Sequence, residues 1–198
     1  MTTSEQWSQE TKKIFNGILL YSFAGIAHGI LDPIDSLMSM GKMFGASSGG
    51  GTISTLCYIA LAGIIGGYVL TFLGLSGFKN ILKTEDAASI SKIRTAFVLA
   101  LVGAAVSFIP LMGWVGGILN IIAFILMLMG YSALKKSATF PELARKGASL
   151  LFVAVILLIV GAILDFIPVA GGVLNGIFSI IAYIMTLLGW KKIVNAEE

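Results

Sequence analysis

The stretch SFIPLMGWVGGILN (residues 107–120) returns in shorter form as DFIPVAGGVLN (165–175), and each version places a proline before a run of glycines. The first version lies in the middle of residues 95–134, forty residues without a charge. A single helix of that length would measure about 60 Å, about twice the thickness of a bilayer's hydrocarbon core. Proline and glycine are the residues that break a helix and allow a tight turn. We therefore predict two antiparallel membrane helices, 95–110 and 114–134, with Pro110 in the turn between them.

The second version has the same setting. Asp165 is the single charge between Gly147 and Trp190, so we predict helices over 147–167 and 172–190 with Pro168 in their turn. A third and more divergent version lies near the start, where GILDPI (29–34) is similar to AILDFIP (162–168). Here aspartate followed by proline is expected to end the first helix. A long connection, 32–52, then leads to a second helix over 53–78.

The second helix of each hairpin ends in a related way, with glycine, then an apolar or aromatic residue, then lysine: LGLSGFKN, MGYSALKK and LGWKKIVN. The fold class predicted is all-α, a polytopic integral membrane protein whose six transmembrane helices form three tandem helical hairpins. The hairpins are expected over approximately 12–83, 84–137 and 138–193 of a single transmembrane domain, 1–198. Stacked copies of one small unit bury surface that a lone unit would leave open.

Composition supports this prediction and excludes other classes of protein. Hydrophobic residues make up 57% of the chain and charged residues 12%, against about 25% charged in ordinary soluble domains. A net charge of +3 without a basic stripe gives no sign of a nucleic-acid partner. One cysteine, Cys57, and one histidine form no disulfide, catalytic set or metal-ligand cluster. We therefore expect no enzyme activity, no cofactor and no metal.

Basic residues divide unequally between the two sides of the predicted membrane. Twelve of the thirteen lysines and arginines fall before the first span, between hairpins or after the last span, and Lys42 is the exception. Loops rich in lysine and arginine stay in the cytoplasm. Both termini are therefore expected to be cytoplasmic.

Two local patterns indicate how the helix ends are anchored. Trp7, Trp114, Tyr131 and Trp190 lie near predicted span ends, where aromatic residues favour the membrane interface. Thr139 and Glu142 have the spacing of a capping box, which would begin a helix just before the membrane.

Three ionisable residues within the predicted spans are candidate polar or ion-path residues: His28, Asp32 and Asp165. His28 and Asp32 are four residues apart and share a helix face. Ionisable residues inside a membrane often serve transport of ions or protons. Asp32 is predicted near the outer interface, however, where water is close. A structural pair or a solvated polar rim is therefore the other interpretation.

Glycines at G-x-x-x-G spacing are candidate helix-packing residues, because small side chains let membrane helices approach closely. The predicted contacts are either within the monomer or between copies of the chain. The pairs are Gly25 and Gly29, Gly63 and Gly67, Gly113 and Gly117, and Gly172 and Gly176.

The helix–FIP–glycine–helix pattern, continued by LMGYSALKK and FPELARKGASLLFVAVILLIVGAI, resembles small prokaryotic multi-pass membrane protein families of unknown function. The resemblance covers about residues 94–168. It implies a multi-pass protein of the prokaryotic plasma (inner) membrane and names no activity. The long first connection, 32–52, departs from that pattern.

These features indicate two functions. The first is a non-enzymatic structural or interaction subunit that self-associates or binds another membrane protein in the lipid bilayer. The second is a homo-oligomeric pore, channel or small transporter. Repeats with an even number of spans are parallel, whereas the inverted repeats of many transporters need an odd number. The parallel repeats therefore favour the first function and leave an oligomeric pore open.

Overall fold

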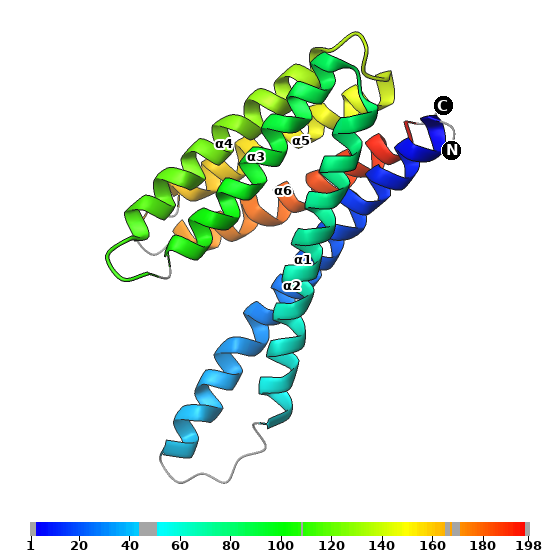
Figure 1. The fold of residues 1–198 in the computed structure, drawn as a ribbon. Helices are drawn as coiled ribbons and strands as arrows, with labels where there is room; N and C mark the ends of the chain where they lie inside the picture. The colour runs from blue at the N-terminus through cyan, green and yellow to red at the C-terminus, as the bar shows by residue number, and fades with distance from the viewer. Residues whose placement is uncertain (1–2, 44–50, 108, 165–166, 168–170, 197–198) are drawn as a thin grey trace. The chain divides into compact units, whose positions relative to one another are not determined.

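The computed structural model describes residues 3–43, 51–107, 109–164, 167 and 171–196. These residues form six α-helices and the turns between them (Figure 1). All six helices are long and apolar enough to cross a membrane, so the prediction of an all-α chain with six such helices is confirmed. The helices are α1 (Thr3–Met43), α2 (Gly51–Ile81), α3 (Thr84–Ser107), α4 (Gly113–Lys136), α5 (Glu142–Leu164) and α6 (Gly171–Val194).

The first helix does not end where the sequence predicted. α1 has 41 residues and continues through Asp32 and Pro33 to Met43, and α2 begins at Gly51, so the expected connection over 32–52 is wrong. Proline lacks an amide hydrogen and removes one helix bond, but it does not forbid a helix that other contacts hold on both sides. Such a contact lies just beyond the proline, because the Ser54 hydroxyl of α2 donates a 2.6 Å hydrogen bond to Asp35 of α1.

The other predicted breaks fall between helices. Pro110 lies in the short turn between α3 and α4, beside Leu111, which has a left-handed φ of 67°. α5 ends at Leu164 and α6 begins at Gly171. Pro168 and Asp165 lie outside the described residues. At their other ends α3 and α5 begin earlier than predicted, which adds turns that carry the charged residues.

The chain divides into two compact units. One comprises residues 1–15 and 72–198, and the other comprises residues 16–71. In the first unit, α3 packs against α4, α4 against α5 and α5 against α6. The start of α1 lies beside the end of α6, so both ends of the chain meet at one end of this bundle (Figure 1).

A glycine near the end of α2, α4 and α6 sets the register of each helix pair. A Cβ atom at Gly130 of α4 would lie 2.6 Å from Ile93 Cγ1 and 2.9 Å from the Ser89 carbonyl oxygen. At Gly189 of α6 it would meet Leu151 and the Gly147 carbonyl in the same way. Gly74 of α2 meets Ile14 and the Glu10 carbonyl. In all three pairs, therefore, the glycine rests on two residues of the preceding helix that are four positions apart.

Small residues continue this contact along the helices at intervals of seven. On α4 the series is Gly116, Ala123 and Gly130, and on α6 it is Asn175, Ala182 and Gly189. The facing series are Ser89, Ala96 and Gly103 on α3 and Gly147, Ala154 and Gly161 on α5, all buried. A seven-residue repeat is typical of left-handed, coiled-coil-like packing at about 20°. α1 and α2 have the same spacing, with Gly17 and Ala24 on α1 and Ala60, Gly67 and Gly74 on α2.

The predicted G-x-x-x-G pairs divide into closed and open ones. Gly63 and Gly67 pack against Ala24 and Tyr21 of α1. A Cβ atom at five other predicted positions would meet no atom within 4 Å, and Gly172 is exposed. Packing within the monomer therefore accounts for one pair, and the remaining pairs face away from the described helices of their own unit. The five open positions are Gly25, Gly29, Gly113, Gly117 and Gly176.

The aromatic residues do not all lie where an interfacial belt would place them. Trp190 is 2% exposed and Tyr131 is 7% exposed, so both belong to the core, and their predicted role at the lipid interface is wrong. The small residue that precedes each of them lets the partner helix come close enough to cover the ring. Trp114, at the start of α4, is 70% exposed and available to an interface.

Candidate functional site

The lysine-rich end of the first unit comprises the start of α1, the ends of α2, α4 and α6, and the starts of α3 and α5. An aromatic cluster holds it together. The Trp7 ring of α1 lies 4.8 Å from the Phe78 ring of α2 and 5.6 Å from the Phe140 ring before α5, measured between centroids. Its indole N–H donates a 2.9 Å hydrogen bond to the Ile193 carbonyl of α6. Trp7 therefore connects the α1–α2 pair to the α5–α6 pair, a role that its position in the sequence did not reveal.

A buried carboxylate makes a second connection at the same end. Asp86, in the first turn of α3, is 2% exposed and accepts a 2.7 Å hydrogen bond from the Thr139 hydroxyl of the α4–α5 loop. The other carboxylate oxygen, Oδ1, is buried and has no partner in the described part of the chain. The predicted capping box, in which Thr139 would cap the helix that contains Glu142, is therefore wrong. α5 begins at Glu142, and Thr139 bonds to another helix, while the Pro141 carbonyl accepts from the Arg145 amide.

A second carboxylate lies in the contact between α1 and α2. Glu10 forms a 2.7 Å ion pair with Lys13, and its second oxygen is buried without a hydrogen-bond partner among the described residues. A Cβ atom at Gly77 of α2 would collide with this carboxylate, so glycine is needed there to admit it. Burying a polar oxygen without a partner costs about 1–3 kcal/mol. These contacts make the lysine-rich end the most polar part of the core.

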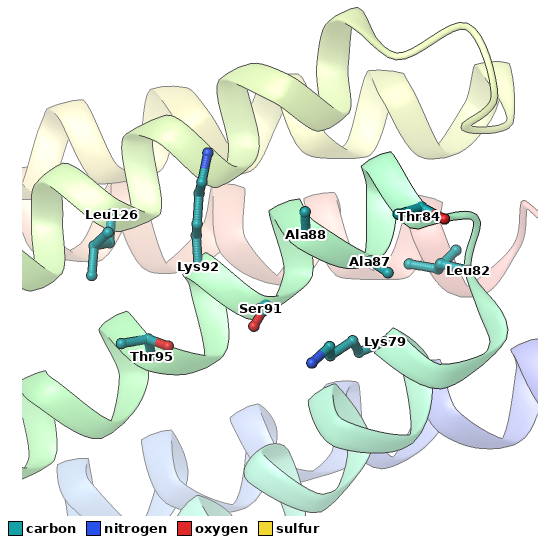
Figure 2. Close-up of a pocket in the computed structure, with 9 residues that line it drawn as sticks. All are labelled: Lys79, Leu82, Thr84, Ala87, Ala88, Ser91, Lys92, Thr95 and Leu126. Carbon is teal, nitrogen blue, oxygen red and sulfur yellow. The ribbon is translucent and has the colours of Figure 1, made fainter.

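An open groove of about 620 Å³ runs along α3 between α2 and α4 at this end. In Figure 2 the Lys79 ammonium and the Ser91 hydroxyl point into the same space, while Lys92 points toward α4. Neither lysine has an ion-pair partner in the part of the chain that the structure describes. The groove lining includes no carboxylate. The other lining residues are Leu82, Thr84, Ala87, Ala88, Thr95 and Leu126.

A second recess, of about 440 Å³, lies where α4 and α5 meet. Four of its lining residues are basic, but two of these are occupied. Lys146 forms a 2.7 Å ion pair with Glu142, and Lys135 Nζ lies 3.6 Å from the centre of the Phe152 ring. The four basic residues are Lys135, Lys136, Arg145 and Lys146.

Two of the three polar residues predicted as an ion path, His28 and Asp32, belong to α1. His28 is half-buried and Asp32 is exposed, one helical turn apart on α1 in the second unit. Asp165 lies outside the described residues. Asp35 was not among the predicted residues, although it is an acid three residues after Asp32. Its hydrogen bond with Ser54 is a polar contact between α1 and α2 in this region.

Hydroxyl groups inside the apolar helices bond within their own helix. Thr71, Ser107 and Thr186 each donate to the carbonyl oxygen four residues earlier, at 2.8 Å. Such bonds use the hydroxyl proton within the helix and leave the oxygen's lone pairs as acceptors. These three side chains therefore donate their hydroxyl protons within their own helices.

The described residues contain no group of three or more histidine, cysteine, aspartate and glutamate side chains that could hold a metal ion. No family model matches the chain, and neither a curated protein nor a solved structure is similar to it. The function is therefore inferred from the contacts and surfaces of the chain itself.

Proposed function

We propose that the chain is an integral membrane protein of three tandem hairpins, with both termini in the cytoplasm, that acts as a self-associating structural or interaction subunit. Its six apolar helices and the large apolar side chains on their surfaces support the membrane location. Ile121 of α4 is 59% exposed, Ile180 of α6 is 62% exposed and Ile65 of α2 is 58% exposed. Lipid is the solvent that accepts such side chains without cost.

One observation carries the proposed role. α4 and α6 each carry an exposed G-x-x-x-G pair at the same position relative to the seam of small residues. One glycine of each pair lies three residues before the first small residue of the seam, and the other lies one residue after it. These pairs are Gly113 and Gly117 around Gly116, and Gly172 and Gly176 around Asn175. All four glycines are exposed. A second membrane helix can approach closely at such positions, so they are the surface through which copies of the protein associate.

Energy transfer between labelled full-length chains in lipid vesicles tests this association. The double variant Gly117→Leu and Gly176→Leu should lower the transfer, because leucine would hold the neighbouring helix away. The matched control is Ile121→Leu with Ile180→Leu, which changes exposed side chains on the same two helices. Transfer that is unchanged by the glycine variant would contradict association through these faces.

Cysteine labelling tests the orientation in a Cys57→Ala background. Residue 137 follows α4 at the lysine-rich end, and Leu111 lies in the opposite turn and is 94% exposed. In intact cells, Ser137→Cys should react with membrane-permeant thiol reagents alone. Leu111→Cys should also react with impermeant reagents, and the reverse pattern would overturn the proposed topology.

A homo-oligomeric pore is the second candidate, and a specific face of α1 favours it. Gly25, Gly29 and Asp32 lie at intervals of four and three, so they share a face, and the two glycines contact nothing within 4 Å in their unit. Copies packed through this face would bring Asp32 and its neighbour His28 toward a common axis. The double variant Asp32→Asn and Asp165→Asn keeps the side-chain size and removes both charges. If reconstituted wild-type protein conducts ions and this variant changes the flux, the protein is a pore and the proposal of a structural subunit is wrong.

A further inference from the structure

The groove along α3 combines two kinds of surface, one basic and polar and the other apolar. Lys79 and Lys92 supply positive charge, and the Ser91 and Thr95 hydroxyls, one helical turn apart, supply hydrogen-bond donors (Figure 2). Leu82, Leu126 and the alanines of α3 supply an apolar wall. Because the lining includes no acid, the groove attracts anions.

The charged residues of the groove lie at the edge of the uncharged helix segments. On α2 no charge occurs between Gly51 and Phe78, and Lys79 is the next residue. On α3, Arg94 is the last charge before the forty uncharged residues that continue into α4. In a bilayer this edge coincides with the lipid phosphates, and basic side chains between membrane helices on the cytoplasmic side are suited to anionic headgroups.

Neighbouring contacts keep the mouth of the groove basic. Arg94 Nη1 lies 3.4 Å from the Ser76 hydroxyl oxygen, and the Arg94 guanidinium carbon lies 5.7 Å from the centre of the Phe72 ring. These contacts with α2 hold a third positive charge near the lysines. In the other basic recess, by contrast, Glu142 and the Phe152 ring already engage two of the four cations.

We infer that this groove binds one anionic phospholipid from the cytoplasmic leaflet. The Lys79 ammonium contacts the phosphodiester and the Ser91 hydroxyl donates to it, while Lys92, which points toward α4, adds a second positive charge to the groove lining (Figure 2). The acyl chains run along the apolar surface past Leu126, where Val98 of α3 and Ile125 of α4 are 39% and 51% exposed. The inference rests on the proposed membrane location and does not require the protein to be a scaffold.

Native mass spectrometry of the full chain in detergent, titrated with dioleoyl phosphatidylglycerol, tests the inference. Each basic residue near an anionic lipid surface contributes about 1 kcal/mol, so the double variant Lys79→Gln and Lys92→Gln should weaken binding by about 30-fold. The control Lys191→Gln with Lys192→Gln removes the same charge from the end of α6 and should change binding less than about 2-fold. Equal weakening by both variants would show that net charge alone attracts the lipid and would overturn the site.

Two further arms separate a lipid from a small anion. Ala88→Trp fills the groove without changing its charge, and it should weaken phosphatidylglycerol binding by about 10-fold while the variant keeps the elution volume and melting temperature of the wild type. Glycerol phosphate, which has the headgroup without acyl chains, should not displace the lipid at equal concentration. Displacement by glycerol phosphate, or undiminished lipid binding by Ala88→Trp, would overturn the lipid assignment.

The outcome is distinguishable from a failure of the proposed function. A chain that is soluble without detergent would disprove the membrane location. A chain that remains in detergent and retains phosphatidylglycerol no better than phosphatidylcholine would disprove the lipid site alone. Loss of energy transfer between chains, with lipid binding intact, concerns self-association and not the groove.

Discussion

The α1–α2 pair and the two later pairs share one packing rule at the lysine-rich end but differ in length beyond it. Gly74, Gly130 and Gly189 rest on the preceding helix in the same way. Over their full lengths, α3 to α6 have 23 or 24 residues each, whereas α1 has 41 and α2 has 31. The extra length carries Asp32, Asp35 and Ser54. The small residues of the seam therefore set the packing that all three pairs share. The polar residues Asp32, Asp35 and Ser54 belong to the additional length of the first pair.

The largest expected effect tests whether the rule is common to all three pairs. Leucine at Gly74, Gly130 or Gly189 would force a side chain into a partner side chain and a backbone carbonyl, at Cβ distances of 2.6–3.0 Å. Each substitution should lower the free energy of unfolding by about 4 kcal/mol, measured by denaturing-detergent titration. Gly117→Leu, at an open position, should cost less than about 0.5 kcal/mol. If leucine at one of the three positions leaves the free energy of unfolding unchanged, that pair does not follow the packing rule of the other two.

The next effect concerns how the first pair is attached at the lysine-rich end. Trp7→Ala removes the contacts with Phe78 and Phe140 and the hydrogen bond to Ile193, and it should cost about 3 kcal/mol. Hydrogen exchange should then accelerate in residues 3–15 and leave the amides of α3 unchanged. Uniform acceleration through α3 to α6 would mean that the first pair is not separately attached. Trp7→Phe, which keeps a ring but not the N–H, is the matched control and should cost about 1 kcal/mol.

The attachment of the second pair to the third depends on a polar contact in place of an aromatic one. Thr139→Val keeps the shape of the side chain and removes the hydroxyl, leaving the buried Asp86 carboxylate without this donor. We expect a loss of about 2 kcal/mol in the free energy of unfolding. Thr139→Ser, which retains the hydroxyl, should cost about a quarter of that. If valine and serine have equal effects, the hydrogen bond contributes nothing and the loop packs by shape.

The smallest expected effect concerns the hydrogen bond between Ser54 and Asp35 in the longer first pair. Ser54→Ala removes the 2.6 Å hydrogen bond to Asp35 beyond Pro33 and should cost about 1 kcal/mol. Its effect should be confined to faster hydrogen exchange in residues 34–38 of α1. Ser76→Ala, which changes a hydroxyl bonded to the Phe72 carbonyl and to Arg94 of α3, is the control and should leave that exchange unchanged. Unaltered exchange in Ser54→Ala would show that packing alone carries α1 past the proline.

Prediction from the sequence succeeded where one strong physical constraint decides the outcome. The runs without charge are too long to cross a membrane once, and they contain helix-breaking residues such as Pro110 and glycines. Each run therefore divides into two helices, which leads to six helices in all. It failed where two weak constraints compete. Asp32 and Pro33 favour the end of a helix, but α1 continues through them to Met43, and its Asp35 bonds to Ser54 of α2. The G-x-x-x-G pairs are likewise conspicuous in the sequence, whereas the seams are formed by less obvious seven-residue series of small residues.

The contacts of the lysine-rich end were beyond reach for a different reason. Trp7 and Ile193 are 186 residues apart, and Asp86 and Thr139 are 53 residues apart, and no local spacing relates them. The groove residues Lys79 and Lys92 were recognised as markers of topology. Their place in the lining of one groove depends on how α2 and α4 pack beside α3, which the pattern of charges does not encode.

The seven-residue spacing of small residues also governs which insertions and deletions this chain can accept. One residue added within a seam would rotate everything beyond it by about 100° and bring a bulky side chain where an alanine or glycine belongs. Seven residues added to each helix of a pair would restore the face and lengthen both helices together. Changes of length are therefore confined to whole heptads or to the helix ends beyond the last seam position. The extra residues of α1 and α2 lie beyond Ala24 and Ala60, where such growth leaves the seam intact.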